Sequence, residues 1–472
     1  MYSFLLLFLL LSIQQYQCGP STDKVTNLPG LTFTPSFDHY SGFLKADNNK
    51  YFHYWLTESS RSASKDPLVV WLNGGPGCSS LDGLIEELGP FHIKDYGQSV
   101  YYNEYSWNRF ANVLFLESPA GVGWSYSTDG NVATSDDEVS LNNYNALVDF
   151  LNKFPEYQGR EFWITGESYA GVYIPTLALR IINDPGNFPI FRGVAIGNGA
   201  LNFPNNYNTM VPFYYYHAIV KDGLYNQIAV DCCNNNIEKC DIFSKFSDPH
   251  CKTIIIDALD GTNELNMYNL YDVCYYDPSS STKRPFIERQ LRRIVGLPQR
   301  KHRSTVDATS VPLCAQTNNT YAYLNRMDVR KALHIPSSLP MWTECSDDVG
   351  NNYKVTHFNV IPEFQAMIAA NKKILVYNGD VDTACNSIMN LQFLTSLNLQ
   401  ILDADADHVI PWHYSGQTGT AVAGFQTRYS GNVDFLTVRG SGHFVPEDKP
   451  REAQQMIFNF INNRDYSLPI LL

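Results

Sequence analysis

Short apolar runs and longer segments with helical spacing alternate along most of the chain. The apolar runs predict strands at 51–57, 68–72, 112–116, 161–165, 193–197, 373–377 and 435–438. Segment 139–152 carries Leu141, Leu147, Val148 and Leu151 at helical spacing, and further helices are predicted at 173–182, 329–335 and 451–462. Strand–helix–strand repeats of this kind predict an α/β fold, with a mostly parallel sheet between helices on both faces.

The pattern changes between residues 206 and 312. This stretch is rich in Cys, Asn and Tyr, and residues 283–303 hold eight Lys and Arg side chains. We predict an inserted cap at 206–312 that is held by its own disulfides and divides the core into residues 19–205 and 313–472. The basic segment 283–303 is expected to be an exposed loop of the cap that proteases can reach.

The first 18 residues predict a signal peptide. Phe4 to Leu11 is an unbroken apolar run that is too short to span a bilayer, and polar residues follow it before Cys18. A membrane anchor is the alternative interpretation. Because no later segment is apolar for long enough, we expect a protein of the secretory pathway with no membrane span after the signal is removed.

Charge and cysteine content agree with an exported protein. With a formal net charge of -13, the chain is a poor candidate for nucleic-acid binding, which needs a basic face for phosphate contacts. Ten cysteines become nine when Cys18 leaves with the signal, and an odd number predicts disulfides plus one free thiol. Asn318 begins an Asn-Asn-Thr acceptor for N-glycosylation. No paired Cys-x-x-Cys spacing is present, so no metal site is predicted.

The sequence Gly-Glu-Ser-Tyr-Ala-Gly at 166–171 joins a predicted strand to a predicted helix. Gly-x-Ser-x-Gly in this context is typical of a nucleophile elbow, a sharp turn that lifts the hydroxyl of Ser168 above the sheet edge. A serine that caps the helix is the alternative. Because a serine hydroxyl is a weak nucleophile alone, the hypothesis needs an acid and a histidine later in the chain.

Both partners follow in the required order. Asn-Gly-Asp-Val-Asp at 378–382 comes directly after a predicted strand, so Asp380 and Asp382 are both candidate acids. His443 lies between the last predicted strand and the final helix, where an α/β-hydrolase places its base. The glycine-rich segment 73–80 follows an early strand, where the second oxyanion donor is expected. A phosphate-binding loop is disfavoured there because no Lys-Ser/Thr follows at the required spacing.

Four segments resemble signatures of the serine carboxypeptidases. They are WLNGGPGCSS at 71–80, GESYAG at 166–171, NGDVDTACN at 378–386 and GSGHFVPEDKP at 440–450. Together with VRKALHIP at 329–336, they are most similar to the cathepsin A branch of that family. The resemblance implies an α/β-hydrolase fold and a peptidase that releases C-terminal residues at acidic pH, through a covalent acyl-enzyme and without a cofactor.

The resemblance also implies roles for individual residues. Ser168 would be the nucleophile, His443 the general base and then acid, and Asp382 rather than Asp380 the residue that orients His443.

Two further groups complete the implied site. The backbone N–H groups of Gly75 and Tyr169 would form the oxyanion hole. Asn73, Glu87 and Glu167 would bind the C-terminal carboxylate of a peptide. Like charges at close range raise a pKa, so the two glutamates are expected to share a proton and to act as donors in acid.

The family pattern further implies the disulfides Cys78–Cys345, Cys232–Cys251, Cys233–Cys240 and Cys274–Cys314, with Cys385 as the free thiol. It is compatible with excision of loop 283–303, with a lysosomal or extracellular destination, with a homodimer and with association with lysosomal glycosidases. Two alternatives stay open. One is the same scaffold with other chemistry, such as an acyltransferase or lyase, against which the set of Asn73, Glu87 and Glu167 argues. The other is a binding protein that stabilises lysosomal hydrolases.

Overall fold

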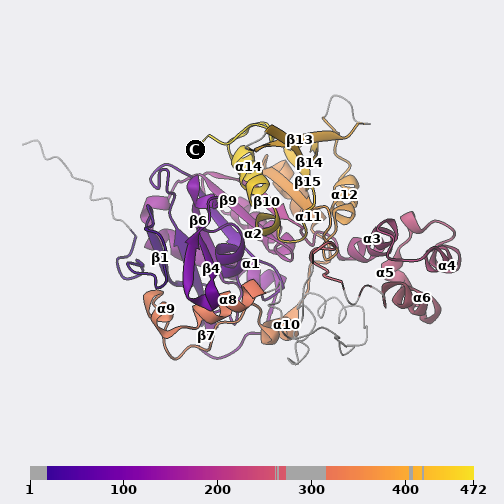
Figure 1. Ribbon diagram of the computed structural model, residues 1–472. Coiled ribbons are helices and arrows are strands. Elements are labelled where there is room, and N and C mark those ends of the chain that lie inside the picture. Colours follow the sequence, from indigo (N-terminus) through magenta and orange to yellow (C-terminus); the bar gives the residue numbers. More distant parts are fainter. Residues whose placement is uncertain are drawn as a thin grey trace, which may run out of the picture.

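Figure 1 shows the computed structural model, in which a large α/β core carries a smaller group of helices at its side. The structure describes residues 19–260, 262, 265–272, 315–402, 408–416 and 419–471. The predicted signal peptide, the basic loop 283–303 and the predicted pair Cys274–Cys314 lie outside the described residues.

An eleven-stranded sheet forms the core, in the order β1-β2-β6-β3-β9-β10-β12-β15-β14-β13 with β7 paired to β2. These strands are β1 (His39–Lys45), β2 (Lys50–Thr57), β3 (Leu68–Leu72), β6 (Asn112–Leu116), β7 (Tyr126–Ser127), β9 (Phe162–Glu167), β10 (Phe191–Gly197), β12 (Lys373–Gly379), β13 (Ile410–Gly416), β14 (Gly419–Tyr429) and β15 (Val433–Val438). The central strands from β6 to β15 pair in parallel, and the pairs at both edges are antiparallel. All seven predicted strands are present, each within two residues of its predicted ends.

Alternate side chains of the central strands enter different hydrophobic clusters. On β3, Leu68 and Val70 pack with helices α1 (Asp136–Lys153), α2 (Ala170–Asn183) and α11 (Ile361–Ala369). Val69 and Trp71 pack with α8 (Ala315–Leu324), α9 (Met327–Ala332) and α14 (Pro450–Ile461). Burial of both faces explains why these strands are continuous apolar runs rather than alternating ones. Four of these helices, α1, α2, α9 and α14, are the predicted ones.

A third hydrophobic cluster lies in the cap, at the right of Figure 1. It is built from α3 (Phe203–Tyr216), α4 (Asp222–Cys232), α5 (Ile242–Lys245) and α6 (Pro249–Asp260). The disulfide Cys232–Cys251 links α4 to α6, and Cys233–Cys240 links the residue after α4 to the segment before α5. Because α3 begins at Phe203, the first cap helix starts slightly before the predicted boundary at residue 206.

The remaining elements are short, apart from α12. They are β4 (Phe91–Lys94), β5 (Ser99–Tyr102), β8 (Thr134–Ser135), α10 (Asp347–Asn352), β11 (Tyr353–Lys354), α12 (Ser387–Ser396) and α13 (Val445–Asp448). A third disulfide, Cys78–Cys345, fastens the glycine-rich loop to the segment before α10, and Cys385 is a buried free thiol. The three disulfides are among the four pairs that the resemblance implies. In the described part of the chain, no helix is long and apolar enough to cross a membrane.

Candidate active site

Ser168 lies on the turn between β9 and α2, at the carboxyl edge of the parallel strands. Its φ of +61° is a left-handed conformation that a residue with a side chain adopts only when its surroundings enforce it. The N–H of Ser168 donates to the carbonyl of Gly197 (3.0 Å), and its carbonyl accepts from the N–H groups of Gly171 and Ala200 (2.9 Å each). A Cβ on Gly171 would lie 2.6 Å from the backbone nitrogen of Ala200, so a glycine is required there.

His443 and Asp382 meet on the loops that follow β15 and β12. The parallel pairing of β9, β10, β12 and β15 brings these loops to the same sheet edge as Ser168. His443 Nδ1 lies 2.8 Å from Asp382 Oδ2, and both side chains are buried. His443 Nε2 is buried without a hydrogen-bond partner in the described structure, so it is available to accept a proton. Asp380, the other candidate acid, accepts from the N–H of Gly440 (2.7 Å) instead.

Asp382 is held by more donors than His443 alone. It accepts from Asn198 Nδ2 (2.7 Å), the Ala384 N–H (2.8 Å) and the Cys385 N–H (3.1 Å). Four N–H donors match an ionised carboxylate, which offers acceptors only. Asn198 was not singled out in the sequence. It directly follows β10 at the active edge of the sheet, and this position is the signal that could have identified it.

The glycine-rich loop packs directly on the nucleophile elbow. A Cβ on Gly74 would lie 2.4 Å from the backbone nitrogen of Tyr169 and 2.6 Å from Ser168 Cβ. Gly75 has a φ of +115°, which lets the loop turn sharply at this point. The two residues with predicted oxyanion donors, Gly75 and Tyr169, therefore belong to backbone segments that touch beside Ser168.

Asn73, Glu87 and Glu167 form one buried cluster. Asn73 Nδ2 donates to Glu167 Oε1 (3.0 Å) and to Glu87 Oε1 (3.2 Å). Its Oδ1 accepts from Trp71 Nε1 (2.7 Å) and the Gly83 N–H (3.1 Å), which fixes the orientation of the amide. Glu87 ends a π-helical turn, Gly83–Glu87, and is 1% exposed, so it is not a surface charge.

Both glutamates of this cluster hold protons more tightly than free carboxyl groups. Burial raises the pKa of Glu87 to about 7, although hydrogen bonds from Asn73 and Glu167 oppose the shift. Burial, and next the negative charge of Glu87, raise the pKa of Glu167 well above its usual range. Both carboxyl groups accept from the same Asn73 amide, so they lie close together, and burial with like charge favours a proton on the pair.

Comparison with known proteins identifies the family to which the chain belongs. The sequence pattern of the family described as serine carboxypeptidase matches residues 29–463. The chain belongs to the serine carboxypeptidase family. It is a serine-type peptidase that releases C-terminal residues from peptides and proteins.

Relatives of this carboxypeptidase match over nearly their whole length. Serine carboxypeptidase ctsa-4.1 of Caenorhabditis elegans is 77% identical over 454 residues, covering 96% of each chain. The lysosomal protective protein of Mus musculus is 42% identical over 476 residues, covering 98% of each chain. The crystal structure of Kex1ΔP, a prohormone-processing carboxypeptidase from Saccharomyces cerevisiae, has a TM-score of 0.74 and 24% identity, and the match covers 94% of this chain and 96% of that one. The last likeness shows that the fold is that of an α/β-hydrolase.

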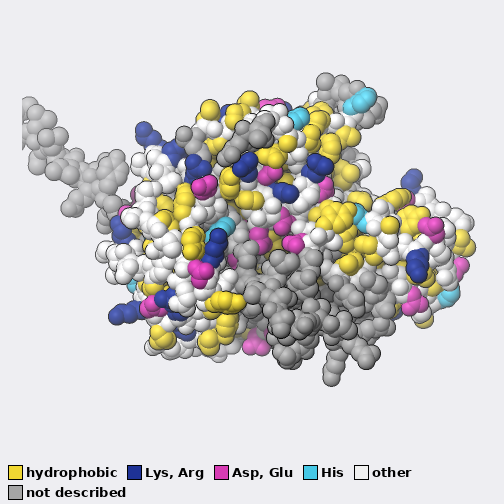
Figure 2. Space-filling model, viewed as in Figure 1, with side chains coloured by type: hydrophobic (Ala, Val, Ile, Leu, Met, Phe, Trp, Pro, Cys, Tyr) yellow, Lys and Arg dark blue, Asp and Glu magenta, His cyan; other side chains and the backbone are white. Residues whose placement is uncertain are grey.

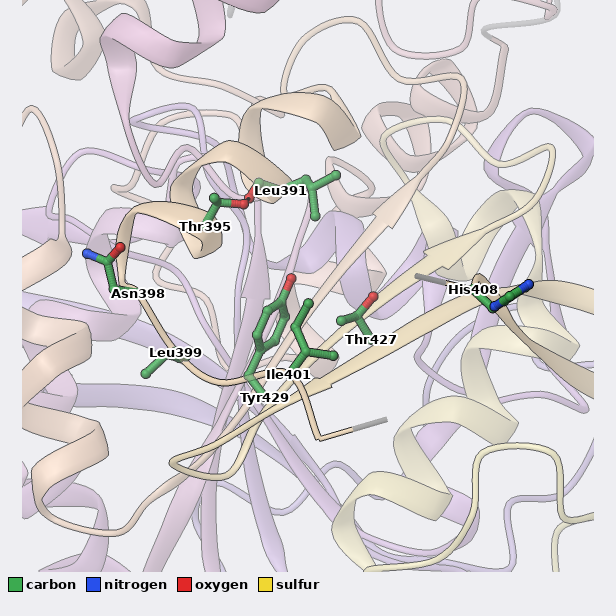
Figure 3. Close-up of a pocket in the computed structure, with 8 residues that line it drawn as sticks. All are labelled: Leu391, Thr395, Asn398, Leu399, Ile401, His408, Thr427 and Tyr429. Carbon is green, nitrogen blue, oxygen red and sulfur yellow. Dashed lines mark hydrogen bonds between the residues drawn. The ribbon is translucent and has the colours of Figure 1, made fainter. Parts of the chain in front are cut away.

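Two other features of the carboxypeptidase are a pocket and an acidic region of the surface (Figure 2). Figure 3 shows a pocket of about 510 Å³ that contains none of the predicted site residues. It is lined by Leu391, Thr395, Asn398, Leu399, Ile401, His408, Thr427 and Tyr429. On the face seen in Figure 2, acidic side chains gather near the middle, between the core and the cap helices. Within the described ranges, no group of three His, Cys, Asp or Glu side chains could hold a metal ion.

Proposed function

We propose that Ser168, His443 and Asp382 are the catalytic triad of this carboxypeptidase, and that it works best at acidic pH. The observation that carries the proposal is the contact between His443 Nδ1 and Asp382, which leaves the buried Nε2 available at the sheet edge where Ser168 lies. The strained turn at Ser168 agrees with a nucleophile that must stand above the sheet.

The reaction follows from these positions. His443 Nε2 takes the proton of Ser168 Oγ as the hydroxyl attacks the carbonyl of the last peptide bond, and His443 then gives the proton to the leaving amine. The peptide stays bound to Ser168 as an ester until water, activated by the same imidazole, releases it. Backbone N–H groups of Gly75 and Tyr169 would bind the oxyanion, and each such donor is typically worth about 10²–10³ in rate.

Asn73, Glu87 and Glu167 would select a free C-terminus. The proton held by the glutamate pair is a donor that suits a carboxylate, and Asn73, whose two N–H bonds point to the glutamates, orients the pair. When the pair loses this proton, its negative charge increases and it repels the substrate. Because burial raises the pKa values of both glutamates, the donor is intact in acid and is lost as the pH rises.

The cellular setting of the proposal is the lysosome, reached through the secretory pathway. The support is the match to a relative named lysosomal protective protein. An extracellular destination, glycosylation at Asn318, which lies in α8, and cutting of loop 283–303 stay predictions. A homodimer and an association with lysosomal glycosidases also stay predictions.

One assay tests the triad and the carboxylate site together. Trypsin-nicked protein is incubated at pH 5 with an N-blocked Phe-Leu dipeptide and, in parallel, with its C-terminal amide. We expect rapid release of leucine from the free acid, much slower cleavage of the amide and no turnover by Ser168→Ala. Turnover by a folded Ser168→Ala protein would contradict the role of Ser168, and equal cleavage of acid and amide would contradict the carboxylate site.

A further inference from the structure

Glu117 is a fully buried carboxyl group that the reaction described above does not use. It directly follows β6, at the same sheet edge as the nucleophile, and is 0% exposed. Its Oε1 accepts from Ser79 Oγ and from Trp342 Nε1 (2.9 Å). Its Oε2 accepts from the Trp124 N–H (3.0 Å) and lies 2.9 Å from His53 Nδ1. Two N–H groups that can only donate, the hydroxyl of Ser79 and the ring of His53 together occupy both oxygens of the carboxyl group.

His53 carries the matching charge. Its Nε2 lies 2.9 Å from Ser41 Oγ, and Ser41 Oγ donates its single proton to the carbonyl of Leu333 (2.8 Å). Ser41 therefore accepts from His53 Nε2, and His53 Nδ1 faces the carboxyl group of Glu117. The result is an ion pair between His53 and Glu117 whose side chains are both 0% exposed. Ser41, His53 and Glu117 are not a second triad, because the hydroxyl of Ser41 is buried and already committed to Leu333.

The ion pair connects directly to the glycine-rich loop. Ser79, which donates to Glu117, belongs to that loop, and its N–H donates to the carbonyl of Glu344 (2.7 Å). The indole N–H of Trp342 is shared between Ser79 Oγ (3.2 Å) and Glu117. The disulfide Cys78–Cys345 adds a covalent link next to Ser79. Glu117 Oε1 thus accepts from the glycine-rich loop through Ser79. It also accepts, through Trp342, from the segment to which that loop is joined by the disulfide.

The position of the Glu117 carboxylate is tightly confined. A Cβ on Gly123 would lie 1.7 Å from Glu117 Oε1, so only glycine leaves space for the carboxylate. The backbone of Glu117 is also fixed, because its N–H donates to the carbonyl of His53 (3.0 Å) and its carbonyl accepts from Ser125 Oγ (2.7 Å). Glu117 therefore holds the hydroxyl of Ser79 in a fixed position.

We propose that Glu117, neutralised by His53, is a positioning residue for the oxyanion hole. By holding Ser79 it fixes the loop 73–80, and with it the N–H of Gly75, at the place where negative charge develops during acyl transfer. This inference rests on the proposed role of Gly75. Oxyanion stabilisation depends strongly on distance, since a donor must stand about 2.7–3.1 Å from the developing oxyanion. When the hydrogen bond from Ser79 to Glu117 is lost, the N–H of Gly75 is expected to shift. The chemical step then slows, while substrate binding at Asn73 and the glutamates continues.

The test compares Glu117→Gln with Asp66→Asn. Gln keeps the shape of Glu117, but its amide group must face at least one of the donors that the carboxylate accepted. Asp66 is a matched control, because it is buried, pairs with Arg61 (2.6 Å) and precedes β3 at the end opposite to the glycine-rich loop. Measurements are kcat and KM for the N-blocked Phe-Leu dipeptide per titrated active site, the rate at which a fluorophosphonate labels Ser168, and the melting temperature.

We expect Glu117→Gln to lower kcat and the labelling rate about 10- to 100-fold, with KM changed less than about threefold. Asp66→Asn should lower the melting temperature and leave kcat per titrated site unchanged. A kcat of Glu117→Gln within about twofold of wild type would overturn the inference, because a merely structural ion pair changes the melting temperature but not the rate of the folded enzyme.

Two further variants keep the test decisive. His53→Gln removes the charge partner, and in the double variant with Glu117→Gln the losses in kcat should be far from additive if the two residues act as a unit. If Glu117→Gln does not fold, Trp342→Phe removes one donor, keeps a large aromatic ring and is judged by the same criterion. A failure of the triad proposal can be told apart from a failure of this inference, because only the former leaves Ser168→Ala active.

Discussion

Two buried carboxyl sites in the active site are built in opposite ways. Asp382 receives four N–H donors, whereas Glu87 and Glu167 share the amide of Asn73. Many donors suit a permanent anion that orients an imidazole. Too few donors leave a carboxyl pair that must keep a proton. The same residue types at the same depth thus serve opposite purposes, and the number of donors decides which.

The largest effect is expected at the donor-rich site. Asp382→Asn places an amide where His443 Nδ1–H donates, so the imidazole turns to the wrong tautomer and cannot accept the proton of Ser168. We expect kcat to fall about 10⁴-fold, as for the equivalent change in other serine hydrolases, with a small change in KM. Steady-state kinetics with active-site titration measures this. The neighbouring Asp380→Asn is the control, and a comparable loss there would show that the two aspartates are not distinguished as the hydrogen bonds indicate.

The donor-poor site should respond in its pH dependence. Glu167→Gln keeps a hydrogen-bond donor but cannot ionise, so the fall in kcat/KM toward neutral pH should move to higher pH, with a loss of about tenfold at pH 5 from the altered hydrogen bond. The sign follows from the raised pKa of Glu167, whose protonated form is the working one.

The control for that profile is Glu58→Gln. Burial also raises the pKa of Glu58 to about 7, but Glu58 directly follows β2 and bonds to Tyr157 rather than to the active site. Its replacement should leave the pH profile unchanged. A wild-type profile in Glu167→Gln would mean that another group sets the alkaline limit.

A third site, where His357 lies between the carboxyl groups of Asp137 and Glu363, is expected to show a smaller effect, on stability rather than on catalysis. His357 Nε2 lies 3.1 Å from Asp137 Oδ1 and His357 Nδ1 lies 3.1 Å from Glu363 Oε1. Burial lowers the pKa of His357, but the hydrogen bond to Asp137 and the negative charges around it outweigh burial and raise the pKa overall. The hydrogen bond from His357 lowers the pKa of Asp137.

These shifts set a pH window for stability. A raised folded pKa makes the His357 contribution complete below its unfolded pKa of about 6.5, and the contribution is lost as pH rises through the folded value. The Asp137 contribution is present above its unfolded pKa of about 3.9 and is lost in stronger acid. His357→Gln should therefore lower the free energy of unfolding by about 0.5–1 kcal/mol at pH 5 and very little at pH 8, as measured by urea titration.

The matched control for the third site is the more exposed pair of His250 and Asp231. Their atoms lie 3.1 Å apart, but the His250 side chain is 65% exposed, so His250→Gln should change stability little at either pH. If His357→Gln lowers the free energy of unfolding equally at pH 5 and pH 8, the contribution of His357 comes from packing and not from charge.

The parts of the fold that were predicted are those with a strong local pattern. Strands such as β3 and β12 are buried on both faces and read as apolar runs, and α1 and α14 show helical spacing. The edge strands β1, β13 and β14 were not predicted, because polar residues and glycines interrupt their apolar positions, as in HYSGFLK of β1 and GTAVAGFQTRY of β14. In the site, Ser168 and His443 were recognisable from the motifs and their order in the chain.

The missed residues act through contacts between distant segments. Asn198 was overlooked although it contacts Asp382, because the two residues are 184 positions apart. Glu117 was overlooked for the same reason, since its partners Ser79, His53 and Trp342 come from three different segments. No local pattern marks such a residue, because burial and donor count arise only after the strands pair.

The sequence by itself determined the α/β class, the order of nucleophile, acid and base, and the family to which the chain belongs. These depend on residues that are close together in the chain or follow a fixed order along it. The resemblance implied a shared proton for Glu87 and Glu167, but only the tertiary structure shows the burial and the donor counts that distinguish this pair from Asp382 and Glu117. Protonation depends on burial and on donors that Asp382, Glu167 and Glu117 each collect from remote strands and loops, and those neighbours exist only in the folded protein.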